Sequence, residues 1–187
     1  MDNLYEDLVT RYAKNFVPVI VPTFKIIQIK ELVRDIILKK QQEQHHKIDC
    51  KHEFKRFFTG LMGEAAVEEL LQTDIIEWNV GESVDYNHPD IKKLGVGIKT
   101  SERNKFPIIS KENTYPQIIC VLSDKKQDLV FVCGLATPYV LNRYQSDTLV
   151  LSQNLRERGT KTGFYGFPKL IRINNLEDIK NIQGEKQ

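Results

Sequence analysis

The stretch SVDYNHPDIKKLGVGIKTSE, residues 83–102, decides how this chain is interpreted. It contains Asp85 and Asp90, followed by a short apolar run that ends in Lys99. The segments NHPD and KKLG are typical of turns, so we expect a hairpin here. Successive side chains of a strand alternate between its two faces, which places Gly97 and Lys99 on one face and Ile98 toward the core. The stretch therefore predicts that an acid and a lysine meet at one edge of a sheet.

The rest of the sequence divides into a helical first half and a strand-rich second half. Apolar residues at helical spacing predict helices at about 3–16, 24–46 and 51–72, and a short helix within 137–146. Short segments rich in β-branched and aromatic residues predict strands, which are 75–80, 83–86, 95–100, 117–123 and 129–136. One last strand and an irregular basic C-terminal segment follow. We expect an α+β fold with a mixed central sheet flanked by helices.

The composition favours a single folded domain of ordinary size. The chain has 187 residues, of which 41% are hydrophobic and 28% charged, and its net charge is +2. This balance suits a protein with a packed core. The acidic, amphipathic start does not fit a secretory signal, and no apolar run is long enough for a transmembrane helix. Three widely spaced cysteines predict reduced thiols and hence a cytoplasmic protein.

The helix expected at 51–72 carries one carboxylate in an unusual place. Glu64 follows Leu61 by three residues and Phe57 by seven, so it lies on or beside the apolar stripe of the helix. A carboxylate is costly there unless it is paired or binds a cation. Divalent metals held by carboxylates, with a lysine beside them, can hydrolyse a phosphodiester. Glu64, an aspartate of the hairpin and Lys99 have the side chains that this chemistry needs.

The order of these residues resembles the PD-(D/E)xK nuclease superfamily, which includes most type II restriction endonucleases. The resemblance covers residues 51–135: a helix with an inward Glu64, a strand with Asp85, a strand that ends in Lys99, and the later strand YPQIICVL. It implies a restriction-endonuclease-like core, Mg²⁺ as cofactor, Glu64 and Asp85 as metal ligands, and Lys99 as the lysine that serves the attacking water. Residues 1–187 would then form one nuclease domain, with a helical N-terminal segment (1–50), a catalytic core (51–135) and a C-terminal extension (136–187).

Gly97 departs from the family pattern, because an Asp or Glu is expected two residues before the lysine. Some family members move this carboxylate to a later position, and Glu112 lies thirteen residues after Lys99. We therefore expect Glu112 to complete the metal shell. Asp90 forms the only literal Pro-Asp pair, but it falls in the expected turn and is a weaker alternative to Asp85. The missing acid also leaves open a nuclease fold that binds DNA or another protein without cutting.

Local charge and chain length suggest the partners. Residues 153–172 contain five Lys or Arg against one Glu, and such patches can hold phosphates. The candidate contacts to double-stranded DNA are Arg103, Lys105, Arg156, Arg158 and Lys161. The chain is similar to the small cleavage subunit of a heterodimeric type IIS restriction enzyme, which implies that a larger subunit recognises the DNA and nicks one strand while this chain cuts the other. An α+β protein unrelated to nucleic acids is the remaining alternative.

Overall fold

The helices follow the periodicity of the sequence closely. The computed structural model describes residues 2–42, 50–78 and 88–184. Two long helices, α2 (Thr23–Gln42) and α3 (Cys50–Leu71), and the short helix α4 (Pro138–Arg143) lie where they were expected. The helix expected at 3–16 is divided into α1 (Asp2–Leu8) and the 3-10 helix Thr10–Asn15.

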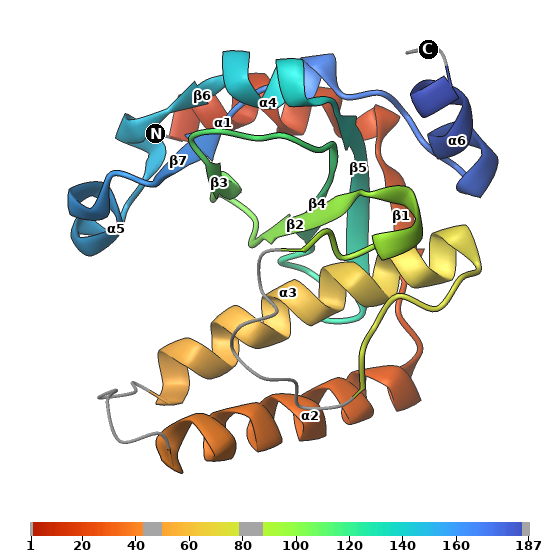
Figure 1. Cartoon of the computed structure of the whole chain (residues 1–187), viewed down its shortest axis with the longest axis vertical. Coiled ribbons are helices and arrows are strands. Elements are labelled where there is room, and N and C mark those ends of the chain that lie inside the picture. The colour runs from red at the N-terminus through yellow and green to blue at the C-terminus, as the bar shows by residue number, and fades with distance from the viewer. Residues whose placement is uncertain (1, 43–49, 79–87, 185–187) are drawn as a thin grey trace.

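A four-stranded mixed sheet forms the centre of the molecule (Figure 1). Its strand order is β1 (Val17–Ile20), β5 (Leu129–Ala136), β4 (Gln117–Leu122) and β2 (Gly97–Ser101). Strand β5 is antiparallel to both of its neighbours, whereas β4 and β2 are parallel. The α+β class and the mixed sheet predicted from the sequence are therefore confirmed.

Strand β1 was not expected, and it lies at one margin of the sheet. No strand was predicted between the first two helices, but the apolar run VPVI pairs with β5, so that Pro18 faces Phe131 in the register. Proline has no backbone N–H, and in sheets it is found on edge strands for that reason. The first fifty residues thus contribute a strand to the central sheet as well as helices.

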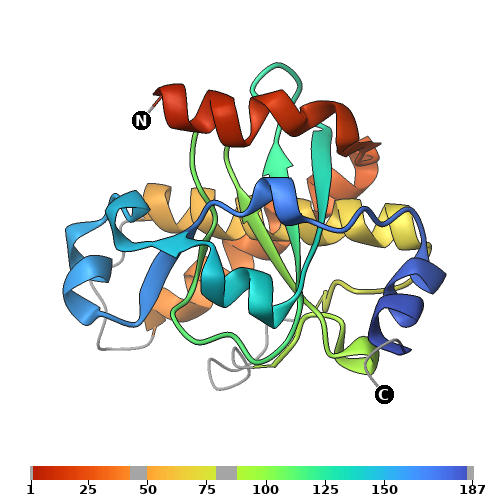
Figure 2. The same cartoon turned by 90° about the horizontal axis from the view of Figure 1, so that it is seen from above.

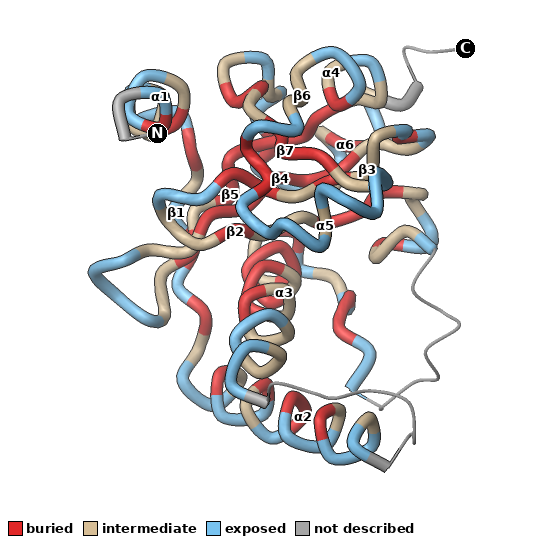
Figure 3. The backbone as a smooth tube through the Cα atoms, turned by 90° about the vertical axis from the view of Figure 1, so that its left-hand side faces the viewer, coloured by how far each residue is buried: buried red, intermediate tan, exposed pale blue. Residues whose placement is uncertain are grey.

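Helix α3 covers one face of the sheet, and α2 packs on the outer side of α3 (Figure 3). Figure 2, which looks at the molecule from above, shows α3 passing beneath the strands. Side chains such as Ile98, Ile118 and Cys120 point into this layer and are buried. The close approach of α3 depends on Gly63, because a Cβ at this position would lie 1.7 Å from Oγ1 of Thr100 on β2. Glycine is needed at position 63 because the helix backbone there already lies against the side chain of Thr100.

A second apolar cluster fills the opposite face of the sheet. Residues of the alternate strand positions, such as Ile119 and Val121, pack there against α1, α4 and a small second sheet. The second sheet has the order β3 (Ile108–Ser110), β7 (Lys161–Phe164) and β6 (Gln145–Ser146). This second sheet lies over the face of β2 and β4 that carries Gly97 and Lys99.

Three sequence-based expectations about the elements were wrong or fall outside the described residues. Residues 75–78, where a strand was expected, form no strand. The strand expected at 83–86 lies outside the described residues. The C-terminal segment is less irregular than expected, because it contains α5 (Gln153–Arg158) and α6 (Leu176–Gly184).

Candidate active site

Asp90 lies at the outer edge of β2, where no other strand of the described residues pairs with it. The backbone N–H of Ile98 donates a hydrogen bond of 2.5 Å to Oδ2 of Asp90. In β2 the N–H of Gly97 bonds to the carbonyl of Pro116, so the N–H of the next residue points away from β4, toward the edge. The Asp90 carboxylate therefore takes the place that another strand would occupy.

A tight turn brings Asp90 to this position. Ile91 and Val96 form an antiparallel bridge, and residues 92–94 between them form one turn of 3-10 helix. Gly95 ends the turn with a φ of 60°, a left-handed conformation that glycine adopts without strain. The KKLG segment is therefore a turn, as predicted, and it folds the chain back so that Asp90 lies beside the start of β2.

Glu64 approaches the same edge from α3. It directly follows Gly63, whose contact with Thr100 fixes the helix against β2. Glu64 is half-buried, and the enclosure of its carboxyl group raises its pKa from 4.5 to about 8. The negative charge of Asp90 raises this pKa further, and the Lys99 amine opposes the shift. The sequence-based placement of Glu64 beside the apolar stripe is thus confirmed.

The arrangement brings together two carboxyl groups and an amine from three separate segments. Like charges disfavour each other in such a site, and a divalent cation between them removes this cost. In the described parts of the chain, no group of three His, Cys, Asp or Glu side chains could hold a metal ion. A divalent ion bound at this edge could use the carboxylates of Asp90 and Glu64, and neutral oxygens would have to supply the remaining protein contacts.

Gly97 has no room for the acid that the family pattern expects. A Cβ at this position would lie 2.9 Å from Cε2 of Tyr115, and 3.5 Å from both Oδ2 of Asp90 and Cγ of Gln117. The aromatic ring therefore occupies the space that an Asp or Glu side chain would need. Tyr115 and Gln117 line the site, and our sequence analysis missed both. A signal for Gln117 was present, since it is a polar residue at the start of the buried strand QIICVL.

Lys99 lies on the face of β2 that looks toward the second sheet. The pKa of Lys161, on β7, is lowered first by its burial and second by the nearby charge of Lys99. The Lys161 amine donates a 3.0 Å hydrogen bond to Oγ of Ser110 on β3. Two amines from different sheets thus face each other across the site, and such a pair attracts anions.

The other predicted site residues lie outside the group formed by Asp90, Glu64 and Lys99, or outside the described residues. Asp85 lies outside the described residues, so its predicted rank above Asp90 stays a prediction. Glu112 is exposed in the segment between β3 and β4. Arg103 and Lys105 follow the far end of β2 and form ion pairs with Asp124 and Glu102, at 3.5 and 2.8 Å.

The basic residues of α5 lie on the surface. Arg156 and Arg158 are both exposed, in a helix that immediately precedes β7 and Lys161. Helix α5 ends at Gly159, which has a φ of 66° and lets the chain turn directly into the strand. The two arginines are thus close in the chain to an amine of the candidate site, which is compatible with their predicted contacts to DNA phosphates.

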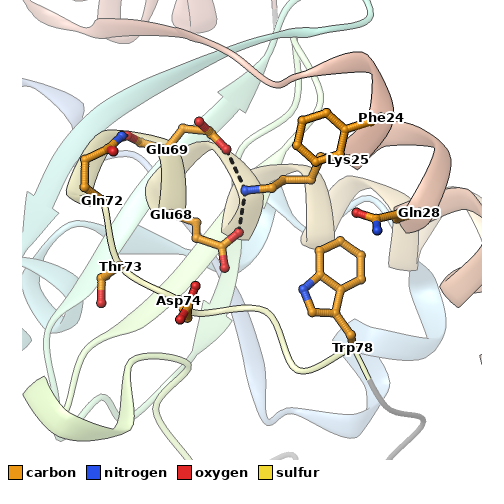
Figure 4. Close-up of a pocket in the computed structure, with 9 residues that line it drawn as sticks. All are labelled: Phe24, Lys25, Gln28, Glu68, Glu69, Gln72, Thr73, Asp74 and Trp78. Carbon is orange, nitrogen blue, oxygen red and sulfur yellow. Dashed lines mark hydrogen bonds and ion pairs between the residues drawn. The ribbon is translucent and has the colours of Figure 1, made fainter.

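An open pocket of about 610 Å³ lies elsewhere, between α2, α3 and the segment that follows α3 (Figure 4). Lys25 bridges Glu68 and Glu69 there, with 2.7 Å to the former. Oε1 of Glu68 also accepts hydrogen bonds from the backbone N–H groups of Ile75 and Ile76. The buried Glu68 carboxylate therefore links α3 to α2 through Lys25 and to the following segment through the two backbone N–H groups. The acidic lining does not suit a phosphate backbone, so we place the chemistry at β2.

Comparisons with known proteins identified no family for this chain. A scan against protein-family models found no match, and neither did searches of curated proteins and of solved structures. Within the described residues, no helix has the length and apolar character needed to cross a membrane.

Proposed function

We propose that this chain is a Mg²⁺-dependent DNA endonuclease with a restriction-endonuclease-like core. The observation that carries the proposal is the position of Asp90, bonded to the edge N–H of Ile98 while its charge acts on Glu64. Lys99 follows Ile98 by one residue and acts on the same carboxyl group. Two acids and an amine near the edge of a mixed sheet match part of the pattern that the resemblance implies, with Asp90 in place of Asp85 and no acid at Gly97.

Each side chain has a role that its surroundings support. Asp90 and Glu64 would hold the cation, and Asp85 stays a further candidate ligand. Bound Mg²⁺ would neutralise charge on the phosphate and make a bound water more acidic. The Lys99 amine would orient the attacking water or stabilise charge on the phosphorus oxygens. Lys161 would hold a neighbouring phosphate of the strand.

We further propose that the chain acts as the cleavage subunit of a type IIS restriction enzyme in the cytoplasm. It would form a heterodimer with a larger subunit that recognises double-stranded DNA, and each subunit would cut one strand. This proposal rests on the resemblance and on the small size of the chain, 187 residues. In the described part of the chain, both sheets and their helices pack around two apolar clusters on the faces of the central sheet, and no separate DNA-reading unit stands apart from them.

A nuclease fold without catalytic activity is the second candidate. The observation that favours it is Gly97, where the Tyr115 ring leaves no space for an acid. Such a protein would still bind DNA through the two facing amines. An α+β protein unrelated to nucleic acids would instead show no salt-dependent affinity for duplex DNA.

Cleavage of supercoiled plasmid by the full chain with Mg²⁺ or Mn²⁺ tests the proposal. We expect nicking that is lost in Asp90→Asn, which keeps an acceptor for the Ile98 N–H, and in Lys99→Met. Asp85→Asn, measured in parallel, ranks the two aspartates. If Asp90→Asn or Lys99→Met cut at the normal rate, the assignment would be wrong. Salt-dependent DNA binding by the wild type, without nicking either alone or together with the larger subunit, would favour the inactive fold.

A further inference from the structure

Gln117 carries a buried oxygen that has no partner among the described residues. Its side chain lies at the start of β4 and is 3% exposed. The side-chain amide nitrogen donates a 3.1 Å hydrogen bond to Oδ1 of Asn113. The side-chain oxygen Oε1 is buried and accepts no hydrogen bond from the described residues. Buried polar atoms are nearly always satisfied, so an atom of this kind requires an explanation.

Backbone groups fix the orientation of this amide. Asn142 Nδ2 donates to the carbonyl of Asn113, and Asn142 Oδ1 accepts from the Asn113 backbone N–H, at 3.0 and 2.9 Å. Asn113 Nδ2 donates to the carbonyl of Ser110 at 2.8 Å, so Asn113 Oδ1 must be an acceptor. Gln117 therefore turns its N–H group toward Asn113. The atom left over is an oxygen, and it needs a donor or a cation.

The position of Gln117 points to a cation. In the parallel register Gln117 lies directly opposite Gly97. Its Cγ and Oδ2 of Asp90 are both 3.5 Å from one point, the place that a Cβ would take at Gly97. The glutamine thus stands beside the carboxylate of the candidate site, in the space next to the acid that the sequence lacks.

We propose that Oε1 of Gln117 is an oxygen ligand of the divalent ion, directly or through one water, in place of the acid missing at Gly97. This inference rests on the proposed function, because it assumes the cation held by Asp90 and Glu64. Amide oxygens are ordinary ligands of Mg²⁺ and Ca²⁺. A neutral ligand gives the site one negative charge less than the family pattern, and this places the wild-type affinity below that of a three-carboxylate site. Glu112, the acid expected to fill this role, is exposed.

The inference can be tested without any cleavage by measuring how tightly the full chain binds Mn²⁺. The free ion gives an electron paramagnetic resonance signal, and binding is measured as the loss of this signal. Gln117→Met removes the amide at similar size, and we expect the affinity for Mn²⁺ to fall about tenfold. The matched control is Gln145→Met. Gln145 also has a buried oxygen without a partner among the described residues, and its Nε2 donates to the carbonyls of Asn142 and Lys111, so it belongs to the same amide network but is not paired with Gly97 in the register. This control and Glu112→Gln should bind Mn²⁺ like the wild type.

The outcomes separate the inference from the function on which it rests. If Asp90→Asn abolishes Mn²⁺ binding but Gln117→Met binds normally, the inference is overturned and the proposed function stands. If Gln145→Met weakens binding as much as Gln117→Met does, the amide network is only structural, and the inference is likewise overturned. Mn²⁺ binding that is absent or independent of Asp90 overturns both. Should Gln117→Met not fold, Gln117→Glu decides: a tighter complex supports the ligand role, and an equal or weaker one refutes it.

Discussion

Replacing Glu64 by glutamine should make the metal-free protein more stable at neutral and alkaline pH. The folded chain holds a proton on Glu64 up to a pKa of about 8, whereas the unfolded chain releases it near the ordinary 4.5. Between these values the folded state binds more protons, so its free energy of unfolding falls as pH rises through this window and levels off above it. The loss is about 3 kcal/mol at pH 7 and approaches about 5 kcal/mol above pH 8. Glutamine has no charge to lose, and Glu64→Gln should escape this penalty.

Urea denaturation in a chelator at about pH 5, 7 and 9 measures the effect. We expect the free energies of unfolding of wild type and Glu64→Gln to be nearly equal near pH 5 and to diverge in favour of the variant as pH rises. Other titrating groups cancel in this difference. Glu177→Gln is a suitable control, because Glu177 forms an exposed ion pair with Lys180 and its loss should change stability by less than about 1 kcal/mol.

The same proton links stability to the metal. A cation that binds the Glu64 carboxylate must displace the proton, so the affinity for Mg²⁺ should rise with pH up to about 8 and then stay level. Calorimetry in buffers of different ionisation enthalpy would detect the released proton. A stability difference between wild type and Glu64→Gln that does not change from pH 5 to pH 9 would refute the reasoning, because it would mean that Glu64 titrates alike in the folded and unfolded chain.

Three other perturbations test other parts of the structure. Gly63→Ala should destabilise the fold by about 2–4 kcal/mol in urea titrations, because its Cβ would collide with Thr100, and Thr100→Gly should restore part of the loss. Lys161→Met should weaken duplex DNA binding and reduce the slope of log affinity against log salt by about one, and an unchanged slope would show that Lys161 meets no phosphate. Cys120 and Cys133 are buried, which raises the pKa of both thiols, so in a Cys50→Ser background neither should react with a thiol reagent at pH 8 until the chain unfolds.

Much of the fold followed from local patterns in the sequence. The long helices, the strands at 97–101, 117–122 and 129–136, and the KKLG turn have strong periodicity or turn chemistry, and each lies within a few residues of its expected position. The strand order could not be predicted in this way. The pairing of β1 with β5 joins segments more than a hundred residues apart, and VPVI is as compatible with an extended linker as with a strand.

The candidate site was predictable only where a side chain had an unusual local setting. Glu64 stood out because it interrupts an apolar stripe, and Lys99 because it ends an apolar strand. The hydrogen bond of Asp90 to the edge of β2 was not predictable, because a turn position does not reveal that the chain folds back onto this strand. Tyr115 and Gln117 lie beside Gly97 because β4 pairs in parallel with β2. This pairing joins segments that are distant in the sequence, so local patterns do not reveal it. Glu112 was nominated by sequence spacing, and its exposed position gives that nomination no support.

The two margins of the central sheet are closed by different means, and this limits how the molecule can associate. Pro18 removes a donor from β1, and Asp90 occupies the outward N–H of β2. An incoming strand would therefore find one margin deficient in hydrogen bonds and the other guarded by a negative charge. Assembly by extending the sheet into a neighbouring molecule, the common route to strand-swapped dimers and fibrils, is disfavoured at both ends. Side chains of the surrounding helices and loops are then the favoured surface for a stable complex.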